Sequence, residues 1–299
     1  MNELKKKSTE MRNQNSMNLD ELSSLEIVRL MNNEDKKVID AVRANDTIIA
    51  GLIDEVIRSF NNHGRLIYIG SGTSGRLGVL DASECPPTFG TDPKQVLALI
   101  SGGYEAAYTA KEGMEDNKEK AVEDLKEINL TSNDVLVGIA ASGSTPYVIR
   151  ALEYAKELGC MTGSICCNKS SPISKISDYP IEAVVGPEVL TGSTRLKSGT
   201  AQKMILNMIS TGSMVGVGKV FENLMVDVKP TNNKLVKRAR SIVMEITGAS
   251  EIAVIDALEK SNNNVKAAIV MIINDLEYEQ AIKKLDGANG FLREAINGL

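Results

Sequence analysis

The amino-acid sequence predicts an α/β fold, built on a parallel β-sheet with helices on both of its faces. Five short apolar runs have the length and composition of buried strands, at residues 65–70, 95–100, 134–140, 161–167 and 181–186. Segments with helical spacing fill the gaps, and such alternation is typical of a parallel sheet in a three-layer arrangement. The chain has 299 residues, 42% of them hydrophobic, and is long enough for one such domain and an appendage.

The region before the first predicted strand has a different character. Residues 1–16 are polar, and we expect them to be extended. Residues 19–35 and 36–62 have helical spacing, and the second of these segments ends at the turn His63-Gly64. We therefore predict that residues 1–62 form an extension whose helices pack on the core.

A glycine-rich segment with hydroxyl side chains follows the first predicted strand, and its residues include Ser71, Gly72, Thr73 and Ser74. Glycines let backbone N–H groups approach an anion closely, and a helix that begins here adds the favourable end of its dipole. The segment is therefore a candidate phosphate-binding loop. It also satisfies the G-x-G-x-x-G pattern of dinucleotide-binding folds, so both kinds of site have to be considered.

A dinucleotide site is the less favoured of the two. It would need an acidic residue at the end of the second strand, about 20 residues further on, to hold the ribose hydroxyls. The second predicted strand, 95–100, instead runs into the polar residues 101–103, and Asp92 lies before it. Pro86 and Pro87 also predict that the helix after the first strand ends early.

A second segment of the same kind follows the predicted strand 134–140. It carries Ser142, Ser144 and Thr145, and the helical segment 147–159 comes directly after it. The carboxyl ends of parallel strands meet at one sheet edge, where hydroxyls and backbone amides of two such loops suit a phosphate group. The chain has no GxxxxGK[ST] motif, so we expect a small phosphorylated molecule and no nucleoside triphosphate hydrolysis.

A third candidate segment lies beyond the last predicted strand. Glu188 follows that strand end, so it would either reach the same pocket or be a solvated loop acid. We expect Arg195 to line the pocket with it. Ser193 or Thr194 is expected to cap the helical segment 197–215, which has a strong apolar face.

The C-terminal part of the chain predicts a small helical module. Residues 225–234 contain a proline and paired asparagines typical of a linker. Residues 239–275 suggest three short helices, broken at Thr247-Gly248 and at Asn262-Asn263-Asn264. We predict a ligand-binding domain over residues 63–228 and a separate helical module over residues 229–299.

Composition excludes several classes of function. The formal net charge is −5, whereas nucleic-acid-binding domains usually carry a basic patch. No run approaches the roughly 18 apolar residues of a membrane span, and the polar N-terminus has no apolar signal core. We therefore expect neither a nucleic acid nor a membrane as a partner.

The four cysteines are Cys85, Cys160, Cys166 and Cys167. Their spacing matches no zinc pattern, so we expect buried thiols of a cytosolic protein and no metal site. Cys85 would be a reactive exception only with a base beside it. The sole histidine, His63, is expected in a solvated turn, which leaves no evident Cys-His or Ser-His-Asp mechanism.

Longer strings resemble a known family. The loops GSGTSGR and ASGST, with GPEVLTGSTRLKSGTAQK, resemble the sugar-isomerase (SIS) phosphosugar-binding fold. The strings LIYIGSGTSGRLGVLDASECPPTFG, EGMED, VGIAASGSTPYVI and NLMVDVKPTN resemble the N-acetylmuramic acid 6-phosphate etherases more closely. TEMRNQNSMNLDELSSLEIVRLMNNED and NGFLREAI fit that family too, so the resemblance covers essentially the whole chain. The C-terminal module resembles a ubiquitin-associated-type (UBA-like) three-helix fold in shape only.

The resemblance implies a carbon–oxygen lyase that needs no cofactor. Such an enzyme removes D-lactate from C3 of N-acetylmuramic acid 6-phosphate and leaves N-acetylglucosamine 6-phosphate, in bacterial cell-wall sugar recycling. Ring opening places an aldehyde at C1, which makes the C2 proton acidic. Lactate then leaves by elimination, and water adds to the unsaturated aldehyde.

The resemblance also implies roles for two carboxylates. Glu84, in SECPP, would protonate the ether oxygen, and Glu115, in EGMED, would take and return the C2 proton. The residues 85–89 include two prolines and a phenylalanine, and this apolar setting would favour the protonated form of Glu84. Taken alone, Glu115 lies among other acids in a helical run, which is typical of a solvated face.

The hydroxyls that would contact the phosphate or the sugar are those of Ser71, Thr73, Ser74, Ser142, Ser144 and Thr145. Two other functions on this fold remain open: an aldose–ketose phosphosugar isomerase with Glu188 as base, and a sugar-phosphate-sensing regulator. The isomerase leaves Glu84 in its Pro-Pro context unexplained, and no basic recognition helix supports a regulator. The etherase is therefore preferred, as a cytoplasmic enzyme and, from the sheet edges and long N-terminal helices, as a homodimer.

Overall fold

The computed structural model describes residues 7–109, 111–229 and 232–298. The chain divides into two compact units. The first comprises Met1–Ser83 and Lys94–Ser210, and the second comprises Glu84–Pro93 and Thr211–Leu299.

The first unit is built on a five-stranded parallel sheet with the strand order β2-β1-β3-β4-β5. The strands are β1 (Leu66–Gly70), β2 (Val96–Ile100), β3 (Val135–Ile139), β4 (Met161–Cys166) and β5 (Tyr179–Glu182). Each pairs in parallel with its neighbour, and Gly70 at the end of β1 lies opposite both Ile100 of β2 and Ile139 of β3. The sheet confirms the predicted fold class, and four of the five strands lie within one residue of the predicted bounds. The fifth, predicted at 181–186, begins two residues earlier and ends four residues earlier.

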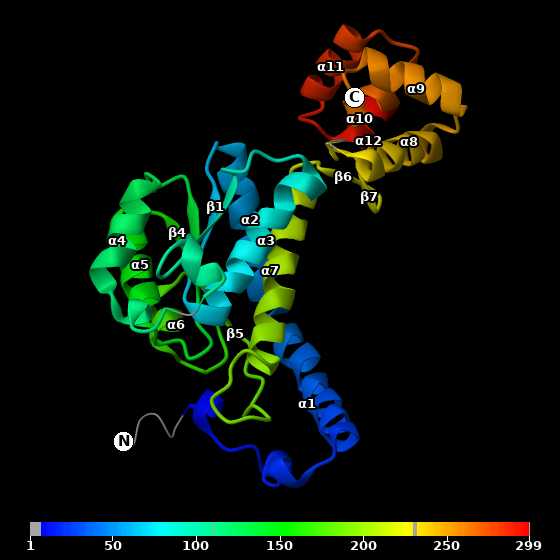
Figure 1. The fold of residues 1–299 in the computed structure, drawn as a ribbon. Coiled ribbons are helices and arrows are strands. Elements are labelled where there is room, and N and C mark those ends of the chain that lie inside the picture. Colours follow the sequence, from blue (N-terminus) through cyan, green and yellow to red (C-terminus); the bar gives the residue numbers. More distant parts are fainter. Residues whose placement is uncertain (1–6, 110, 230–231, 299) are drawn as a thin grey trace. The chain divides into compact units, whose positions relative to one another are not determined.

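Helices cover both faces of this sheet, as Figure 1 shows. On one face lie α2 (Asp46–Asn61), α3 (Gly72–Phe89) and α7 (Lys197–Gly216), and on the other α4 (Lys118–Glu127), α5 (Pro146–Glu157) and α6 (Pro172–Ile176). The second of these faces buries a continuous apolar cluster, in which Ile67, Ile69 and Leu136 of the sheet meet Val148 and Leu152 of α5. Alternate residues of the buried strands therefore supply the two halves of the core.

The N-terminal region differs from two expectations. The predicted break between helices at residues 35 and 36 is wrong, because α1 (Ser24–Arg43) continues through it and ends before Asn45, which directly precedes α2. Residues 32–37, which span the predicted break, are polar and lie largely on the exposed side of α1. Of residues 1–16, which were expected to be extended, residues 1–6 lie outside the described residues, and Ser8–Glu10 and Gln14–Ser16 form short 3₁₀ turns. A third 3₁₀ turn, Leu19–Glu21, stands where the helix predicted from residue 19 was expected to begin.

The helix after β1 is longer than its prolines predict. α3 runs to Phe89 and contains both Pro86 and Pro87. A proline removes one backbone donor, so the carbonyls of Ala82 and Ser83 lose their helical partners. The prolines lie in the last turn, and the Gly90 N–H still bonds to the Pro86 carbonyl, so the helix closes normally at its end.

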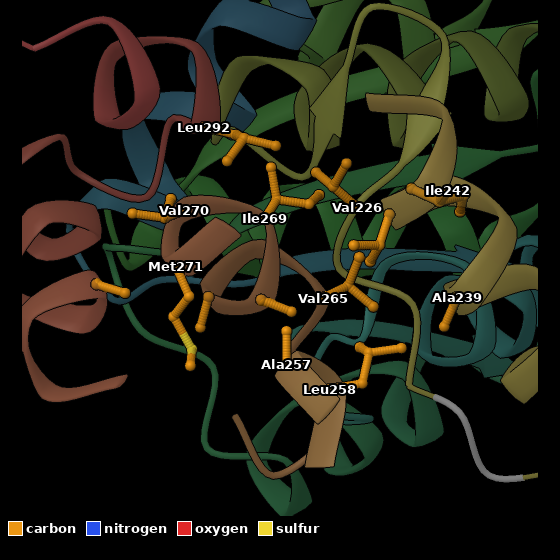
Figure 2. Close-up of a cluster of buried hydrophobic side chains, with 14 of the residues drawn as sticks. Val226, Ala239, Ile242, Ala257, Leu258, Val265, Ile269, Val270, Met271 and Leu292 are labelled. Atoms are coloured by element: carbon orange, nitrogen blue, oxygen red, sulfur yellow. The ribbon is translucent and has the colours of Figure 1, made fainter. Parts of the chain in front are cut away.

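The second unit contains a short hairpin and five helices within its described residues. The hairpin pairs β6 (Val220–Phe221) with β7 (Leu224–Met225), and the helices are α8 (Asn233–Thr247), α9 (Glu251–Lys260), α10 (Val265–Asn274), α11 (Tyr278–Gly287) and α12 (Leu292–Asn297). Figure 2 shows their shared core, where Ile269 and Val270 of α10 pack among Val226, Ile242 and Leu292.

Both predicted breaks in this module are confirmed, at Gly248 after α8 and at Asn262 and Asn263, which have positive φ. The three helices expected within residues 239–275 are confirmed as α8, α9 and α10, and the described part of the module contains two further helices, α11 and α12, beyond that segment. α11 and α12 are short and largely polar on their outer faces, which weakens their signal in the sequence. Of the predicted linker, residues 230–231 lie outside the described residues. The predicted domain limits at 62/63 and 228/229 stay predictions, and the second compact unit takes in residues 84–93 as well as 211–299.

Candidate functional site

The two hydroxyl-bearing loops follow adjacent strands. β1 and β3 pair directly, with Gly70 opposite Ile139, so the loops that begin at Ser71 and at Ala140 leave the sheet side by side. In the order β2-β1-β3-β4-β5, the chain turns to opposite sides of β1, and ligands in such sheets bind at this reversal, beyond the carboxyl ends of the strands. The predicted proximity of the two loops is therefore what the topology produces.

The loop after β1 depends on its glycines. A Cβ on Gly75 would lie 2.7 Å from Ile100 Cγ1 and 2.8 Å from the Gly70 carbonyl oxygen, so only glycine permits this approach of α3 to the strand. Ser74 is buried and donates a hydrogen bond to Gln202 Oε1 on α7 at 3.0 Å. The Ser71 hydroxyl is buried and has no hydrogen-bond partner among the described residues.

The loop after β3 has a comparable constraint. Gly143 has a φ of 69°, and a Cβ there would lie 2.3 Å from the Cβ of Ser171. Ser144 donates its backbone N–H and its hydroxyl to Ser142 Oγ, each at 3.2 Å. Thr145 is the N-cap residue of α5 but makes no capping hydrogen bond with its side chain, so its hydroxyl is available to a ligand.

The N-terminal segment lies against this second loop. Lys7 Nζ donates to Ser144 Oγ at 2.6 Å, and Ser8 Oγ bonds to the Cys167 carbonyl at 2.9 Å. Asn168, directly after β4, donates to Thr9 Oγ1 and to the Ala141 carbonyl, each at 3.1 Å. Residues 7–9 are therefore tied to two loops at the carboxyl edge of the sheet.

Glu188 is neither a solvated loop acid nor an open side chain. It is fully buried, and its carboxylate accepts the backbone N–H groups of Lys197 and Ser198 at 3.0 and 2.9 Å, together with the Ser198 hydroxyl at 2.8 Å. It therefore caps α7, the role expected of Ser193 or Thr194, because a carboxylate satisfies two free N–H groups and complements the helix dipole.

Arg195 has a different position from Glu188. It is exposed and forms no ion pair with any residue in the described part of the chain. A contact of either residue with substrate stays a prediction.

The first residue of α7, Lys197, forms a buried ion pair with Glu34 of α1. Lys197 Nζ lies 2.6 Å from Glu34 Oε2, and both side chains are at most 3% exposed. Glu34 also accepts hydrogen bonds from Asn13, Asn15 and Lys37, each at 2.8 Å. Burial alone would raise the pKa of Glu34, but the hydrogen bonds from these four donors outweigh it and hold the pKa at about 2. The pair joins the N-terminal segment to α1 and α7.

Glu115 lies in the loop between β2 and α4, in the 3₁₀ turn Met114–Asp116 that packs against α5. It is exposed. The turn follows Gly113, which has a φ of 76°, and precedes Asn117, the N-cap of α4. This loop is held to α3 by Arg76, whose Nε donates to the Ala107 carbonyl at 3.1 Å. The structure thus places Glu115 on a loop at the carboxyl edge and not within the predicted helical run.

Glu84 lies near the end of α3, in the segment Glu84–Pro93 that is grouped with the second unit. The sequence predicts an apolar enclosure for it. In the single chain this expectation is wrong, since Glu84 is exposed while Cys85 and Phe89 point into the core. Helical geometry explains the difference, because residues one apart in a helix face directions about 100° apart.

Two polar residues near the loops were not singled out from the sequence. Gln202 is 1% exposed, and its Nε2 has no hydrogen-bond partner among the described residues. Asp81 is buried on α3 and accepts hydrogen bonds from Tyr68, Asn207 and Ser210, and burial raises its pKa. The available signal is a polar residue at a core-facing position of an apolar helix.

The cysteines are free and buried, as predicted. Burial raises the pKa of the Cys160 thiol to about 11 and that of Cys167 to about 12, so neither is a ready nucleophile. Within the described residues, no group of three or more His, Cys, Asp or Glu side chains is placed to hold a metal ion. None of the helices in that part of the chain is both long and apolar enough to cross a membrane.

Comparisons with known proteins agree with this architecture. A family model described as the glucokinase regulatory protein N-terminal SIS domain matches residues 48–156, and the SIS domain model matches residues 117–211. An N-acetylmuramic acid 6-phosphate etherase of Exiguobacterium is 56% identical over 98% of this chain and all of that protein. The chain belongs to the N-acetylmuramic acid 6-phosphate etherase family.

Further etherases are similarly close. One from Geobacillus is 55% identical over 98% of this chain and 99% of its own length, and one from Enterococcus faecalis is 55% identical over 97% and 98%. Among solved structures, a phosphoheptose isomerase from Francisella tularensis is 16% identical, with a TM-score of 0.48, over 64% of this chain and 98% of that one. A likeness this distant carries no functional argument.

Proposed function

We propose that this protein is a carbon–oxygen lyase that removes D-lactate from N-acetylmuramic acid 6-phosphate and leaves N-acetylglucosamine 6-phosphate. The observation that carries the proposal is 56% identity over 98% of the chain to an etherase of that name. The two hydroxyl-bearing loops on adjacent strands, after Gly70 and after Ile139, support a phosphosugar as the ligand.

The loops bind the phosphate and sugar hydroxyls through neutral donors. Thr73 and Thr145 stand at the first turns of α3 and α5, where backbone N–H groups and the helix dipoles favour a dianion. The unpartnered hydroxyl of Ser71 acquires an acceptor when a phosphate binds. Holding the substrate at its phosphate fixes C2 and C3 for the two carboxylates.

Glu115 takes the C2 proton from the open-chain aldehyde, and the electron pair left on C2 forms the C2–C3 double bond as the C3–O bond breaks. Glu84 gives its proton to the departing ether oxygen. Water then adds at C3, its proton passing to a carboxylate, and C2 is reprotonated, which yields N-acetylglucosamine 6-phosphate. Each proton transfer contributes on the order of 10²–10⁴-fold. The reaction as proposed uses no metal or cofactor.

We further propose that the protein acts as a homodimer whose site includes both copies. Glu84 and Glu115 are exposed in the single chain, whereas acid–base catalysis at a poor leaving group favours an enclosed site. α1 also leaves apolar side chains uncovered, with Leu25 58% and Val28 54% exposed one turn apart. A second copy that covers α1 would bury these residues. A cytoplasmic location and the lack of nucleic-acid or membrane partners stay predictions.

The burial and capping role of Glu188 disfavour the isomerase alternative. Both carboxylate oxygens of Glu188 accept hydrogen bonds from the start of α7, and the residue is fully buried, which is a poor setting for a base that must reach a substrate proton. A sensing regulator would use the same loops for binding without turnover. Lactate release separates the etherase from both alternatives.

The experiment is incubation with N-acetylmuramic acid 6-phosphate in heavy-oxygen water. We expect stoichiometric D-lactate and one labelled oxygen at C3 of the product, because the ether oxygen departs with lactate. Lactate release with no label at C3 would rule out elimination and hydration. Tight binding of the phosphosugar without any lactate would reject the etherase and favour a regulator.

A further inference from the structure

Lys7 has an unusual electrostatic position. Its ammonium group donates to the Ser144 hydroxyl at 2.6 Å, and it forms no ion pair with any residue that the structure describes. Ser144 and the N-cap residue Thr145 immediately precede α5. The positive end of the α5 dipole lies there, so the lysine charge and the helix dipole repel each other. An anion held between them would reverse the sign of both interactions.

The position of Lys7 is fixed by its neighbours in the chain. Thr9 is fully buried and accepts a hydrogen bond from Asn168, and Ser8 donates to the Asn168 side chain and to the Cys167 carbonyl. Asn168 in turn donates to the Ala141 carbonyl in the loop after β3. The hydrogen bonds of Ser8 and Thr9 to the residues after β4 thus hold Lys7 beside the loop after β3, where its ammonium group reaches Ser144.

Other polar groups in or beside these loops also lack an acceptor. Ser71 Oγ is buried without a hydrogen-bond partner in the described chain, and so is Nε2 of Gln202, whose Oε1 holds Ser74. Buried polar atoms are rarely left unsatisfied unless a ligand or water completes them. The loop after β1 and the neighbouring α7 therefore each contribute an unpaired donor, in addition to the cation.

We propose that Lys7 is a phosphate ligand of the substrate site and supplies the positive charge that the serine and threonine loops lack. This inference rests on the proposed function, because it assigns the lysine to the same phosphosugar. The ammonium leaves the Ser144 oxygen and donates to the phosphoryl group. The N-terminal segment is then part of the binding site, although Lys7 lies 137 residues from Ser144 in the chain.

The test compares the affinities of the full-length protein and its variants for inorganic phosphate, N-acetylglucosamine 6-phosphate and N-acetylglucosamine by calorimetry. Lys7→Met keeps most of the length of the unbranched side chain and removes the charge. A charged hydrogen bond of this kind corresponds to about a tenfold or greater loss of affinity. We expect that loss for the two phosphorylated ligands only, with little change for N-acetylglucosamine. Lys7→Arg should restore most of the affinity.

Lys260→Met is the matched control, because Lys260 is an exposed lysine of α9, in the second unit, and pairs with Asp256 at 2.7 Å. Its affinities should equal those of the wild type. The wild type should also lose phosphate affinity as ionic strength rises, more steeply than Lys7→Met, since added salt screens the lysine charge.

The outcomes separate this inference from the proposed function. If Lys7→Met binds both phosphorylated ligands as tightly as the wild type, Lys7 is not a phosphate ligand, whether or not lactate is released. If the variant loses phosphate affinity but the wild type releases no lactate, the ligand assignment stands and the etherase does not. A wild type that binds neither phosphorylated ligand rejects both.

Discussion

The two compact units bury different kinds of side chain. The first unit contains buried charges beside the carboxyl edge of its sheet, including Glu188 and the pair Glu34–Lys197. In the second unit the buried core is a continuous apolar cluster from Val226 to Ala295, and among its described residues Lys266 is the buried charge. Lys266 is paired with Asp227 at 2.8 Å.

Buried charges and buried apolar side chains serve different purposes in the two units: the charges hold parts of the site in position, whereas the apolar side chains stabilise the fold. A buried ion pair contributes little net stability, because desolvation offsets most of the attraction between the charges. Apolar burial contributes stability roughly in proportion to the area removed from water. The first unit therefore retains groups that hold the N-terminal segment and the start of α7 in place, whereas the second unit resembles an ordinary packed helical domain.

The largest effect is expected from replacing the two exposed carboxylates, Glu84 and Glu115, that are proposed to transfer protons. Glu84→Gln and Glu115→Gln should each lower the rate of lactate release by about 10²–10⁴-fold, because each removes one proton transfer. Both side chains are exposed, so the unfolding free energy should change by less than about 0.5 kcal/mol. Lactate assays and urea unfolding followed by circular dichroism measure the two quantities. Glu112→Gln, in the same loop as Glu115, is the control and should remain active.

Mixing the Glu84→Gln and Glu115→Gln variants tests whether the two carboxylates of one site come from different copies of the chain. If each site of a symmetric dimer takes Glu84 from one copy and Glu115 from the other, a dimer formed from one of each variant has one intact site. Random re-association then restores about 25% of wild-type activity. No restoration after refolding from a mixture would mean that both carboxylates act from one chain or that no dimer forms.

Local patterns in the sequence predict a large part of this molecule. The alternation of apolar runs predicts five strands, and the glycine and hydroxyl spacing after Gly70 and Ile139 predicts two loops that the strand order then makes neighbours. Glycine and proline positions also locate most helix ends, although Pro86 and Pro87 mislead because a last turn tolerates them.

The remaining features depend on partners far apart in the chain. Glu34 meets Lys197 across 163 residues, and Lys7 meets Ser144 across 137. A single lysine or glutamate in a polar stretch gives no sign of such a partner, since its usual environment is solvent. The capping role of Glu188 was missed for a similar reason, because helix caps are normally sought within a residue or two of the helix start.

The next prediction tests the buried pair of the first unit. Glu34→Ala leaves Lys197 buried without a counter-charge, which should cost about 3–5 kcal/mol of unfolding free energy. Glu153→Ala is the control, because Glu153 is 46% exposed and pairs loosely with Arg150 at 3.7 Å, so its loss should cost about 1 kcal/mol or less. Urea unfolding measures both. Equal small costs would mean that the pair does not organise the first unit.

A matched change in the second unit should lower stability without affecting binding. Ile269→Ala removes a fully buried side chain from the apolar cluster of Figure 2 and should cost about 2–4 kcal/mol. Ile252→Ala, on α9 and 82% exposed, should be nearly neutral. Under folding conditions, neither variant should change the affinity for N-acetylglucosamine 6-phosphate. A tenfold loss of affinity in Ile269→Ala would contradict the division of roles between the units.

The smallest expected effect is the pH dependence of the Glu34 contribution. Because its pKa is about 2 in the folded chain and near 4.5 in the unfolded one, this contribution is fully present above pH 4.5 and declines as pH falls towards 2. The stability difference between the wild type and Glu34→Gln should therefore shrink by about 1.4 kcal/mol between pH 7 and pH 3.5. Glu222→Gln, an exposed acid of the second unit, should show a small difference at every pH. The prediction fails if the difference in unfolding free energy between the wild type and Glu34→Gln stays constant down to pH 3. That result would mean that the hydrogen bonds from the four donors stabilise the charged form of Glu34 no more than burial destabilises it, as in a surface pair.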